Sequence, residues 1–232
     1  MSEDTLSDVL RGVRLMGAVF FAVDASAPWV AETPPKAILA PHIMPGVDHV
    51  IQYHVVTSGT CWASLIDEPP VLLQTGDVII FPQGDQHTMS SAPGMRGALE
   101  VDKFEAAAKS SRLPLAMSLN GGGAAQTKII CGFIGCDSRP FNPLLSALPR
   151  VVHVPQTSGN TGAMRALIDL AYAESSKPRS GGESALARLS ELLFIEVVRH
   201  YVASLPPENL GWLAGLRDEQ VGKALDRLHA EP

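Results

Sequence analysis

The chain has 232 residues, of which 46% are hydrophobic and 18% are charged, so it can bury a sizeable core and is not of the intrinsically disordered class. The formal net charge of −6 argues against a nucleic-acid-binding surface on this chain. The N-terminus lacks the basic start of a secretory signal, and no window holds the ~20 consecutive apolar residues of a membrane span, so we expect a cytoplasmic protein with no membrane partner.

The first predicted element is a short amphipathic helix over residues 5–15, which ends at Gly17. We expect it to cover one end of a barrel. Its apolar positions recur at helical spacing, at Leu6, Val9, Leu10 and Val13.

After this helix, the apolar pattern changes to short runs that Gly, Pro and Asp interrupt, which is typical of β-sandwiches and barrels. Ser58-Gly59 is predicted to be a hairpin turn between paired strands, and residues 67–70 a second such turn. The predicted strands cover residues 18–23, 37–40, 50–56, 60–66, 71–73, 77–81, 96–101 and 128–134.

The most specific pattern is G-D-V-I-I-F-P-Q-G-D-Q-H over residues 76–87. Gly76-Asp77 predicts a turn, the apolar run a buried strand, and Pro82 with Gly84 a second bend. His87 is then expected to point from the next strand into the barrel. The pattern is G-x5-P-x-G-x2-H, and it resembles the second signature of the cupin superfamily, in whose metal-holding members the matching histidine is a ligand.

The first cupin signature is only partly present. It supplies two histidines, and a glutamate seven residues before a turn glycine. If Gly59 is that glycine, the glutamate position is Gln52, and residues 45–48 read P-G-V-D in place of the histidine pair. A neutral amide is a poor replacement for a carboxylate beside a divalent ion. The sequence therefore lacks the usual ligand set of a cupin metal centre.

His54 lies two residues after Gln52 and therefore faces the same side of its strand, so we expect it to project with His87 toward a shared hollow. Two interpretations remain open. The histidines are hydrogen-bonded residues that line a pocket, or His54, His87 and Cys131 (or Cys61) hold zinc, whose usual ligands are imidazole nitrogen and thiolate sulfur. No cofactor follows with certainty.

The cysteines Cys61, Cys131 and Cys136 are odd in number and lie in a chain without an export signal, which predicts reduced thiols.

A mostly apolar pocket with a few polar groups is the usual makeup of a small-molecule site. The aromatic candidates for such a pocket also fit a plain hydrophobic core. The predicted ligand-binding residues are Gln52, His54, Trp62, Phe81, His87 and Phe133.

From residue 156 the apolar period is helical, and a break at residues 178–182 predicts an antiparallel pair of helices, of which the second covers 183–205. The apolar face of this second helix is wide, which predicts either a homodimer through one of its stripes or two stripes that both belong to the core. The first helix carries Met164, Leu167, Ile168, Ala171 and Tyr172. The two stripes of the second are Leu186, Leu189, Leu193, Val197 and Tyr201, and Leu192, Ile195, Val198 and Val202.

Nearly the whole chain resembles the N-terminal cupin-type regulatory region of AraC-family transcription regulators. The resemblance implies a mainly β fold with α, namely a cupin-like double-stranded β-helix barrel followed by a helical pair. The barrel over residues 1–155 would bind an effector and the hairpin over 156–206 would dimerise. Residues 207–232 would be a linker and the first helix of a helix-turn-helix DNA-binding domain. The residues that carry the resemblance are 6–10, 53–56, 59–62, 76–87, 131–132, 143–145, 148–149, 211–218 and 221–230.

On this interpretation the chain is a sensing and dimerising domain rather than an enzyme. It contacts DNA only through a domain that it lacks, and its stop at Pro232 is expected to be a truncation. One alternative is a metal-dependent cupin dioxygenase or isomerase, which needs a metal with open coordination positions. The other is a dimerisation module that binds no ligand.

Overall fold

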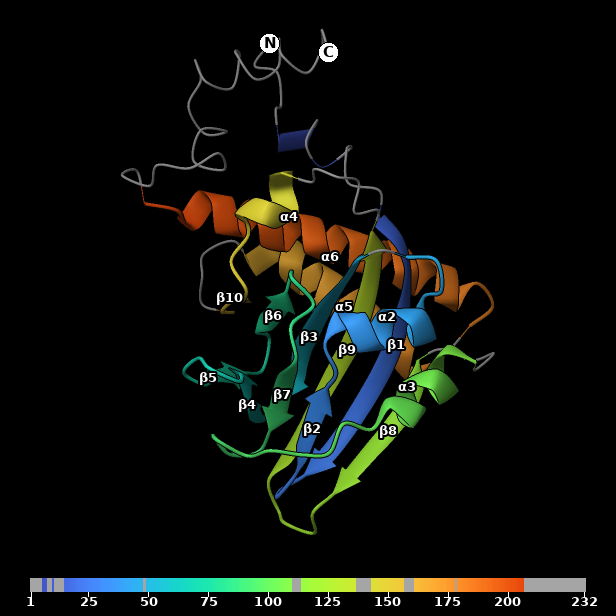
Figure 1. The fold of residues 1–232 in the computed structure, drawn as a ribbon, viewed down its shortest axis with the longest axis vertical. Coiled ribbons are helices and arrows are strands. Elements are labelled where there is room, and N and C mark those ends of the chain that lie inside the picture. The colour runs from blue at the N-terminus through green and yellow to red at the C-terminus, as the bar shows by residue number, and fades with distance from the viewer. Residues whose placement is uncertain are drawn as a thin grey trace, which may run out of the picture.

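The computed structural model describes residues 6–7, 10, 15–47, 49–109, 114–136, 143–156, 161–177 and 179–206. Within these residues the fold consists of ten strands in two sheets and five helices (Figure 1). None of the described helices is long and apolar enough to cross a membrane.

The strands form a large sheet and a small sheet. Strand β1 pairs with β8 in parallel, and the other pairs are antiparallel. The large sheet has the order β10 (Val152–Val154), β6 (Val78–Phe81), β3 (His49–Ser58), β9 (Gln126–Cys136), β1 (Leu15–Ser26) and β8 (Leu115–Asn120). The small sheet has the order β2 (Val30–Thr33), β7 (His87–Ser90), β4 (Thr60–Leu65) and β5 (Val71–Gln74).

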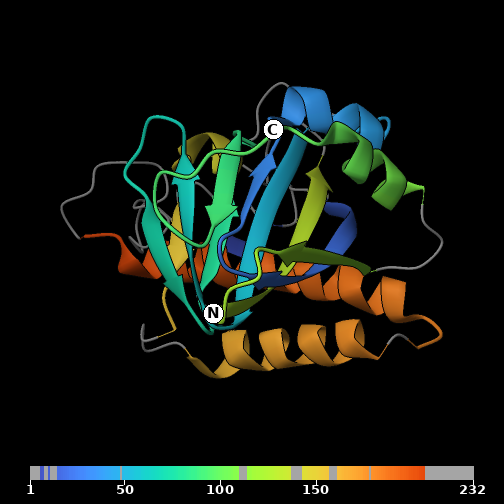
Figure 2. The ribbon, with the colours of Figure 1, turned by 90° about the horizontal axis from the view of Figure 1, so that it is seen from below.

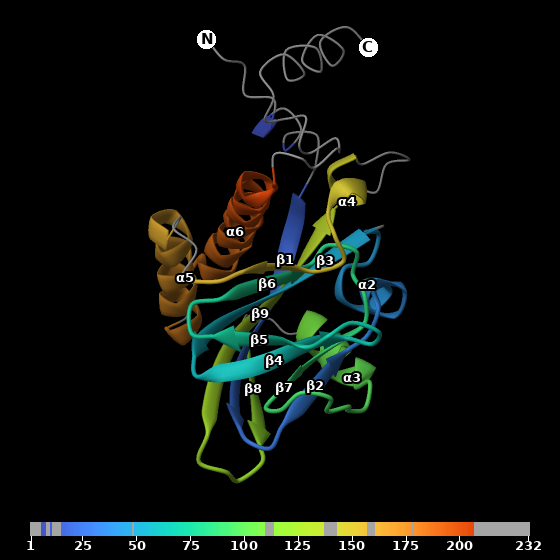
Figure 3. The same cartoon turned by 90° about the vertical axis from the view of Figure 1, so that its left-hand side faces the viewer.

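Both faces of the large sheet are covered. Helix α6 (Gly182–Ser204) lies along the outer face with α5 (Thr161–Ser176) beside it (Figure 2), and the small sheet lies on the other side (Figure 3). Alternate residues of β3 therefore enter two different cores. Ile51 and Val55 pack in the core that includes the helices, and Val50 and Val56 in the core between the sheets.

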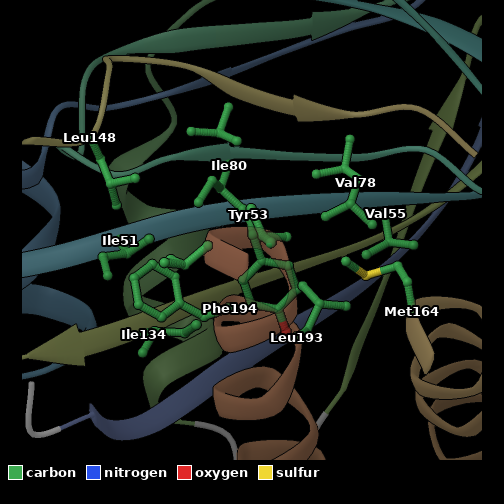
Figure 4. Close-up of a cluster of buried hydrophobic side chains, with 14 of the residues drawn as sticks. Ile51, Tyr53, Val55, Val78, Ile80, Ile134, Leu148, Met164, Leu193 and Phe194 are labelled. Carbon is green, nitrogen blue, oxygen red and sulfur yellow. The ribbon is translucent and has the colours of Figure 1, made fainter. Parts of the chain in front are cut away.

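Buried apolar side chains from the large sheet and from α6 form one core (Figure 4). The Tyr53 hydroxyl lies 2.8 Å from Ser190 Oγ, which in turn donates to the Leu186 carbonyl oxygen. A Cβ added at Gly132, the residue opposite Tyr53 on β9, would lie 2.3 Å from the Tyr53 ring. The tyrosine therefore needs glycine as its neighbour.

The predicted helical pair is confirmed as α5 and α6. The whole first stripe of α6 belongs to or packs against the core, and of the second stripe Val198 and Val202 do. Val197 and Val198, one from each stripe, are fully buried, whereas Leu192 is 48% exposed. A homodimer through one of the two stripes stays a prediction. The alternative, that both stripes belong to the core, is favoured for the buried residues of α6, because the sheet and α5 already cover them.

Two of the predicted strands are wrong. Residues 37–40 belong to helix α2 (Lys36–Ile43), because their buried positions Leu39, Ala40 and Ile43 follow helical spacing. Residues 96–101 form no strand, since Leu99 makes one isolated bridge to Glu32 and helix α3 (Val101–Ala108) begins directly afterwards.

One predicted turn is confirmed and the other is wrong. Residues 67–70 connect β4 and β5, which pair with each other. Gly59 carries the chain from the large sheet to the small one, so the strands on its two sides do not pair. It adopts φ +79°, and an added Cβ would lie 2.2 Å from the Gln126 carbonyl oxygen, which explains why glycine is needed at this crossing.

The remaining predictions concern the ends of the chain. Leu6 and Leu10 of the predicted N-terminal helix are helical and pack against the helix-facing core, but β1 already begins at Leu15, so the predicted end at Gly17 is wrong. Helix α4 (Pro143–Ala147) was not predicted. Residues 207–232, with the expected linker and helix-turn-helix segment, lie outside the described residues.

Candidate functional site

A pair of imidazoles joins the two sheets in the middle of the barrel. His54 comes from β3 and His87 is the first residue of β7, and their Nε2 atoms lie 2.7 Å apart. Both side chains are buried. Phe81 stacks on His87 with the ring centroids 3.7 Å apart and the planes within 12° of parallel. The rings themselves fill this part of the interior, so the expectation of a hollow between the two histidines is wrong.

The hydrogen-bond partners assign the protons of this pair. Nδ1 of His87 lies 2.9 Å from the Asp85 carbonyl oxygen, and since a carbonyl can only accept, Nδ1 donates. In the neutral ring Nε2 of His87 is then a bare acceptor, so His54 donates to it from Nε2. Nδ1 of His54 is left as a buried acceptor, and it has no partner among the described residues.

Burial keeps both rings neutral. It lowers the pKa of His87 to about 4 and places the pKa of His54 well below its ordinary value, with the neighbouring His87 acting in the same direction on His54. Two neutral imidazoles that share one hydrogen bond agree with the proton assignment above.

Gln52 places a second buried acceptor on the same face of β3. Its side chain is fully buried, its Nε2 donates to the Pro34 carbonyl oxygen at 3.3 Å, and its Oε1 has no partner. Burying an unpaired polar atom costs about 1–3 kcal/mol. The inward face of β3 thus offers two acceptors, at Gln52 and His54, that a water molecule or a hydroxyl group would satisfy.

These residues do not fit the zinc site that the sequence suggested. Two nitrogens bound to one zinc ion at 2.0–2.1 Å would be about 3.3 Å apart, farther than the two histidine nitrogens. Cys131 is the register partner of His54, but burial raises the pKa of its thiol and so disfavours the thiolate that binds metals. In the described part of the chain, no three His, Cys, Asp or Glu side chains gather as a metal site.

The other predicted site residues are only partly brought together. Phe81 and Phe133 are both register partners of Gln52, one on each side of β3, and Phe133 also packs against Phe21. Trp62 lies on the outer face of β4, because Cys61 and Ala63 take the inward positions. All three cysteines are buried and form no disulfide, as predicted.

A pocket of about 450 Å³ opens beside this pair, over the ends of β4 and β7. Glu32, Thr88 and Ser64 are register partners across β2, β7 and β4, so they share the outer face of the small sheet. His87 is the link between the pocket and the interior pair. The lining residues are Glu32, Ser64, Leu65, Ile66, Glu68, Pro70, His87, Thr88, Pro93, Gly94, Met95 and Arg96.

The polar end of the pocket is an ion pair that the sequence did not reveal. Both carboxylate oxygens of Glu32 contact the Arg96 guanidinium, and they also accept from the Gly97 backbone N–H at 3.0 Å and the Gln86 amide at 2.6 Å. The bonds from Arg96, supported by those from Gly97 and Gln86, lower the pKa of Glu32 to about 2 although burial raises it. These bonds, with the bridge between Leu99 and Glu32, hold the segment that follows β7 against β2 of the small sheet (Figure 1).

Comparison with known proteins shows the family of the chain. Residues 4–203 match the family model described as Cupin. The chain is 23% identical to the HTH-type transcriptional regulator AlkR of Acinetobacter baylyi, over 99% of this chain and 71% of that protein. It is 26% identical to a putative AraC-like transcription regulator of Streptomyces lividans, over 79% of this chain and 58% of that protein. The chain thus spans between about half and three quarters of the length of these relatives.

Solved structures give weaker likenesses. ToxT from Vibrio cholerae, solved with a bound unsaturated fatty acid, matches 86% of this chain and 61% of its own with a TM-score of 0.40 and 5% identity. A cupin domain of an XRE family transcriptional regulator from Enterobacter cloacae matches 53% of this chain and 93% of its own, with a TM-score of 0.28 and 14% identity.

Proposed function

Because the chain belongs to the cupin family, and to the branch found in AraC-like transcription regulators, we propose that it is the effector-sensing domain of such a regulator. Its role is to bind a small molecule and not to catalyse a reaction. DNA contact belongs to a further domain of the full regulator, which acts in the cytoplasm. The names of the relatives support this assignment.

The observation that carries the proposal is the pocket beside His87. Small-molecule sites are concave, mostly apolar, and hold a few fixed polar groups. This pocket of about 450 Å³ has apolar walls from residues such as Leu65 and Met95, and one polar end at Glu32 and Arg96. Its size is within the range of pockets that take ligands of drug-like size, roughly 300–1,000 Å³.

The imidazole pair supplies a route from the pocket to the large sheet. His87 lines the pocket and bonds through Nε2 to His54, which stands on β3. The opposite face of β3 packs against α6. A ligand that binds one arrangement of His87 better than another shifts the population of that arrangement, and β3 transmits the shift toward the helices.

Dimerisation through the helical pair is part of this proposal. After packing, large apolar side chains on the outside of both helices still face solvent, namely Leu170, Tyr172 and Leu192. Sedimentation of the chain at micromolar concentration is expected to give a dimer, and a monomer throughout would contradict this part.

Sensing is tested by a thermal-shift screen of small metabolites. A ligand that binds the native state raises the melting temperature, so a sensor gives at least one hit with the unaltered chain. Ser64→Phe fills the pocket and should abolish that hit, whereas Ser58→Phe at the exposed end of β3 should keep it. A hit that survives Ser64→Phe, or no hit at all, would speak against the pocket as an effector site.

The two other hypotheses predict different outcomes in the same screen. A cupin enzyme would convert its ligand when a divalent metal is added, but the donor set at Gln52, His54 and His87 does not favour a metal. A dimerisation module that binds no ligand would give no hit. Product analysis of each stabilising compound separates an enzyme from a sensor.

A further inference from the structure

We propose that the effector of this pocket is an organic carboxylate with an apolar body, and that Arg96 binds its carboxylate group. This inference rests on the proposed sensing function and names the chemical class of the ligand. The inference follows from two facts about the pocket. The acceptors of Glu32 are all occupied by hydrogen bonds, and several donors of Arg96 are not engaged with Glu32.

Glu32 has no capacity left for a ligand. An ionised carboxylate accepts about four hydrogen bonds. Oε1 of Glu32 accepts from Gln86 and from Nη2 of Arg96, and Oε2 accepts from Nε of Arg96 and the Gly97 N–H. With its charge balanced and its positions filled, Glu32 orients Arg96 and is not an attachment point for an amine.

Arg96, in contrast, keeps donors for a ligand. A guanidinium has five N–H groups, and the bonds to Glu32 use one at Nε and one at Nη2. The two hydrogens of Nη1 and one of Nη2 are not engaged with Glu32, and the side chain is 52% exposed. Planar arrays of N–H groups match the two oxygens of a carboxylate.

The second acidic residue of the pocket is also neutralised. Glu68 lies 3.2 Å from Nη1 of Arg150, whose Nη2 pairs with Asp85. A cationic ligand would therefore meet two paired carboxylates and the positive charge of Arg96. An anionic ligand would meet the donors of Arg96, with the Ser64 and Thr88 hydroxyls on the same sheet face.

The rest of the pocket sets the requirement for an apolar body. Its walls include aliphatic and proline side chains from the end of β4 and from the segment after β7, and Ile66 is 54% exposed. Covering such a wall removes apolar surface from water, which stabilises the complex. The apolar lining residues are Leu65, Ile66, Pro70, Pro93 and Met95.

The experiment compares two acids with their uncharged amides. Benzoate, octanoate, benzamide and octanamide are titrated into the chain by calorimetry and by thermal shift. We expect the acids to bind and the amides to bind at least about tenfold more weakly, since hydrogen bonds to charged groups are stronger than those to neutral ones. Equal affinity for acid and amide would overturn the proposal.

Substitution of Arg96 then locates the effect. Arg96→Gln should weaken the acids about tenfold or more, and Arg188→Gln on the exposed side of α6 should leave them unchanged. Arg96→Gln also leaves Glu32 buried without its cation, so the double variant Glu32→Gln/Arg96→Gln keeps the test valid if the single variant unfolds. Unchanged acid binding in the folded double variant contradicts the proposal.

The outcomes also separate this inference from the proposed function. If neutral metabolites bind, and Ser64→Phe abolishes their binding while the acids do not bind, the pocket is a sensor site but the carboxylate class is wrong. If neither acids nor neutral metabolites bind, both the class and the sensing function are wrong.

Discussion

The two faces of β3 differ in how their buried polar groups are satisfied. On the face toward α6, the Tyr53 hydroxyl bonds to Ser190, which is itself bonded to a backbone carbonyl. On the face toward the small sheet, Gln52 Oε1 and His54 Nδ1 are buried without a partner in the described part of the chain. Native proteins leave few such atoms unpaired. The helix-facing side therefore satisfies its buried polar groups internally, whereas the inward side keeps two buried acceptors open.

The largest effect that the comparison predicts is on the helix-facing side. Phe194 of α6 is 1% exposed, and Phe194→Ala should lower the free energy of unfolding by roughly 3–5 kcal/mol, through lost burial and a cavity. Leu192→Ala, on the same helix but 48% exposed, should cost much less and serves as the control. Urea unfolding measures both, and equal losses would show that this face is not the stabilising core.

The pH dependence of stability comes next in size and reports on the inward face. Because the pKa of folded His87 is about 4 and its ordinary value is 6.5, the unfolded chain binds more protons between these two values. The contribution of His87 is therefore unchanged above pH 6.5. It falls by on the order of 3 kcal/mol as pH drops through the folded pKa near 4.

Urea unfolding between pH 7.5 and 4.5 measures this dependence. This pH range excludes the contribution of Glu32. The pKa of Glu32 is lowered from 4.5 to about 2, so Glu32 changes the stability only below about pH 4.5. The double variant His54→Leu/His87→Leu should have a flatter profile. A stability that rises as the pH falls from 6.5 would show that the pair is charged in the folded protein.

A smaller effect is expected from removing the hydroxyl of Tyr53. Tyr53→Phe should destabilise the fold by about 1 kcal/mol, since Ser190 keeps its bond to the Leu186 carbonyl and no donor is stranded. Tyr172→Phe on α5, where the side chain is 46% exposed, is the matched control and should have no measurable effect. Thermal or urea unfolding that fails to separate the two variants would contradict the structural role of Tyr53.

The smallest effect has the opposite sign. Gln52→Leu removes a buried acceptor without a partner at the cost of one long bond to Pro34, so stability should change by less than about 0.5 kcal/mol or increase. Gln74→Leu on the exposed side of β5 gives the surface reference. A loss above about 1 kcal/mol would mean that Gln52 is a structural residue like Tyr53.

The sequence predicted best where a local pattern decides the structure. The turn, buried strand and second bend of residues 76–87 all follow from local residue types, and β6 and the start of β7 lie where this pattern predicts them. The period change after residue 155 gave both helices, because amphipathic spacing is a local signal.

What the sequence did not predict depends on contacts between distant residues. Glu32 and Arg96 are 64 positions apart, and their meeting requires the segment after β7 to cross the small sheet. A run of four apolar residues at 37–40 fits a strand and a buried helix equally well. Trp62 was assigned to the interior because aromatic residues favour burial, but the alternation along β4 places it outside.

His54 and His87 are both neutral, and their hydrogen bonds run in one direction. His54 donates to His87, His87 donates to the Asp85 carbonyl oxygen, and Nδ1 of His54 is an acceptor without a partner among the described residues. Nitrogen-15 spectra of histidine-labelled protein at pH 7 test this most directly, because protonated and bare imidazole nitrogens are distinguishable. We predict a proton on Nδ1 of His87, a proton on Nε2 of His54, and a bare Nδ1 at His54. A proton on Nδ1 of His54, or a doubly protonated ring at either position, would contradict the account.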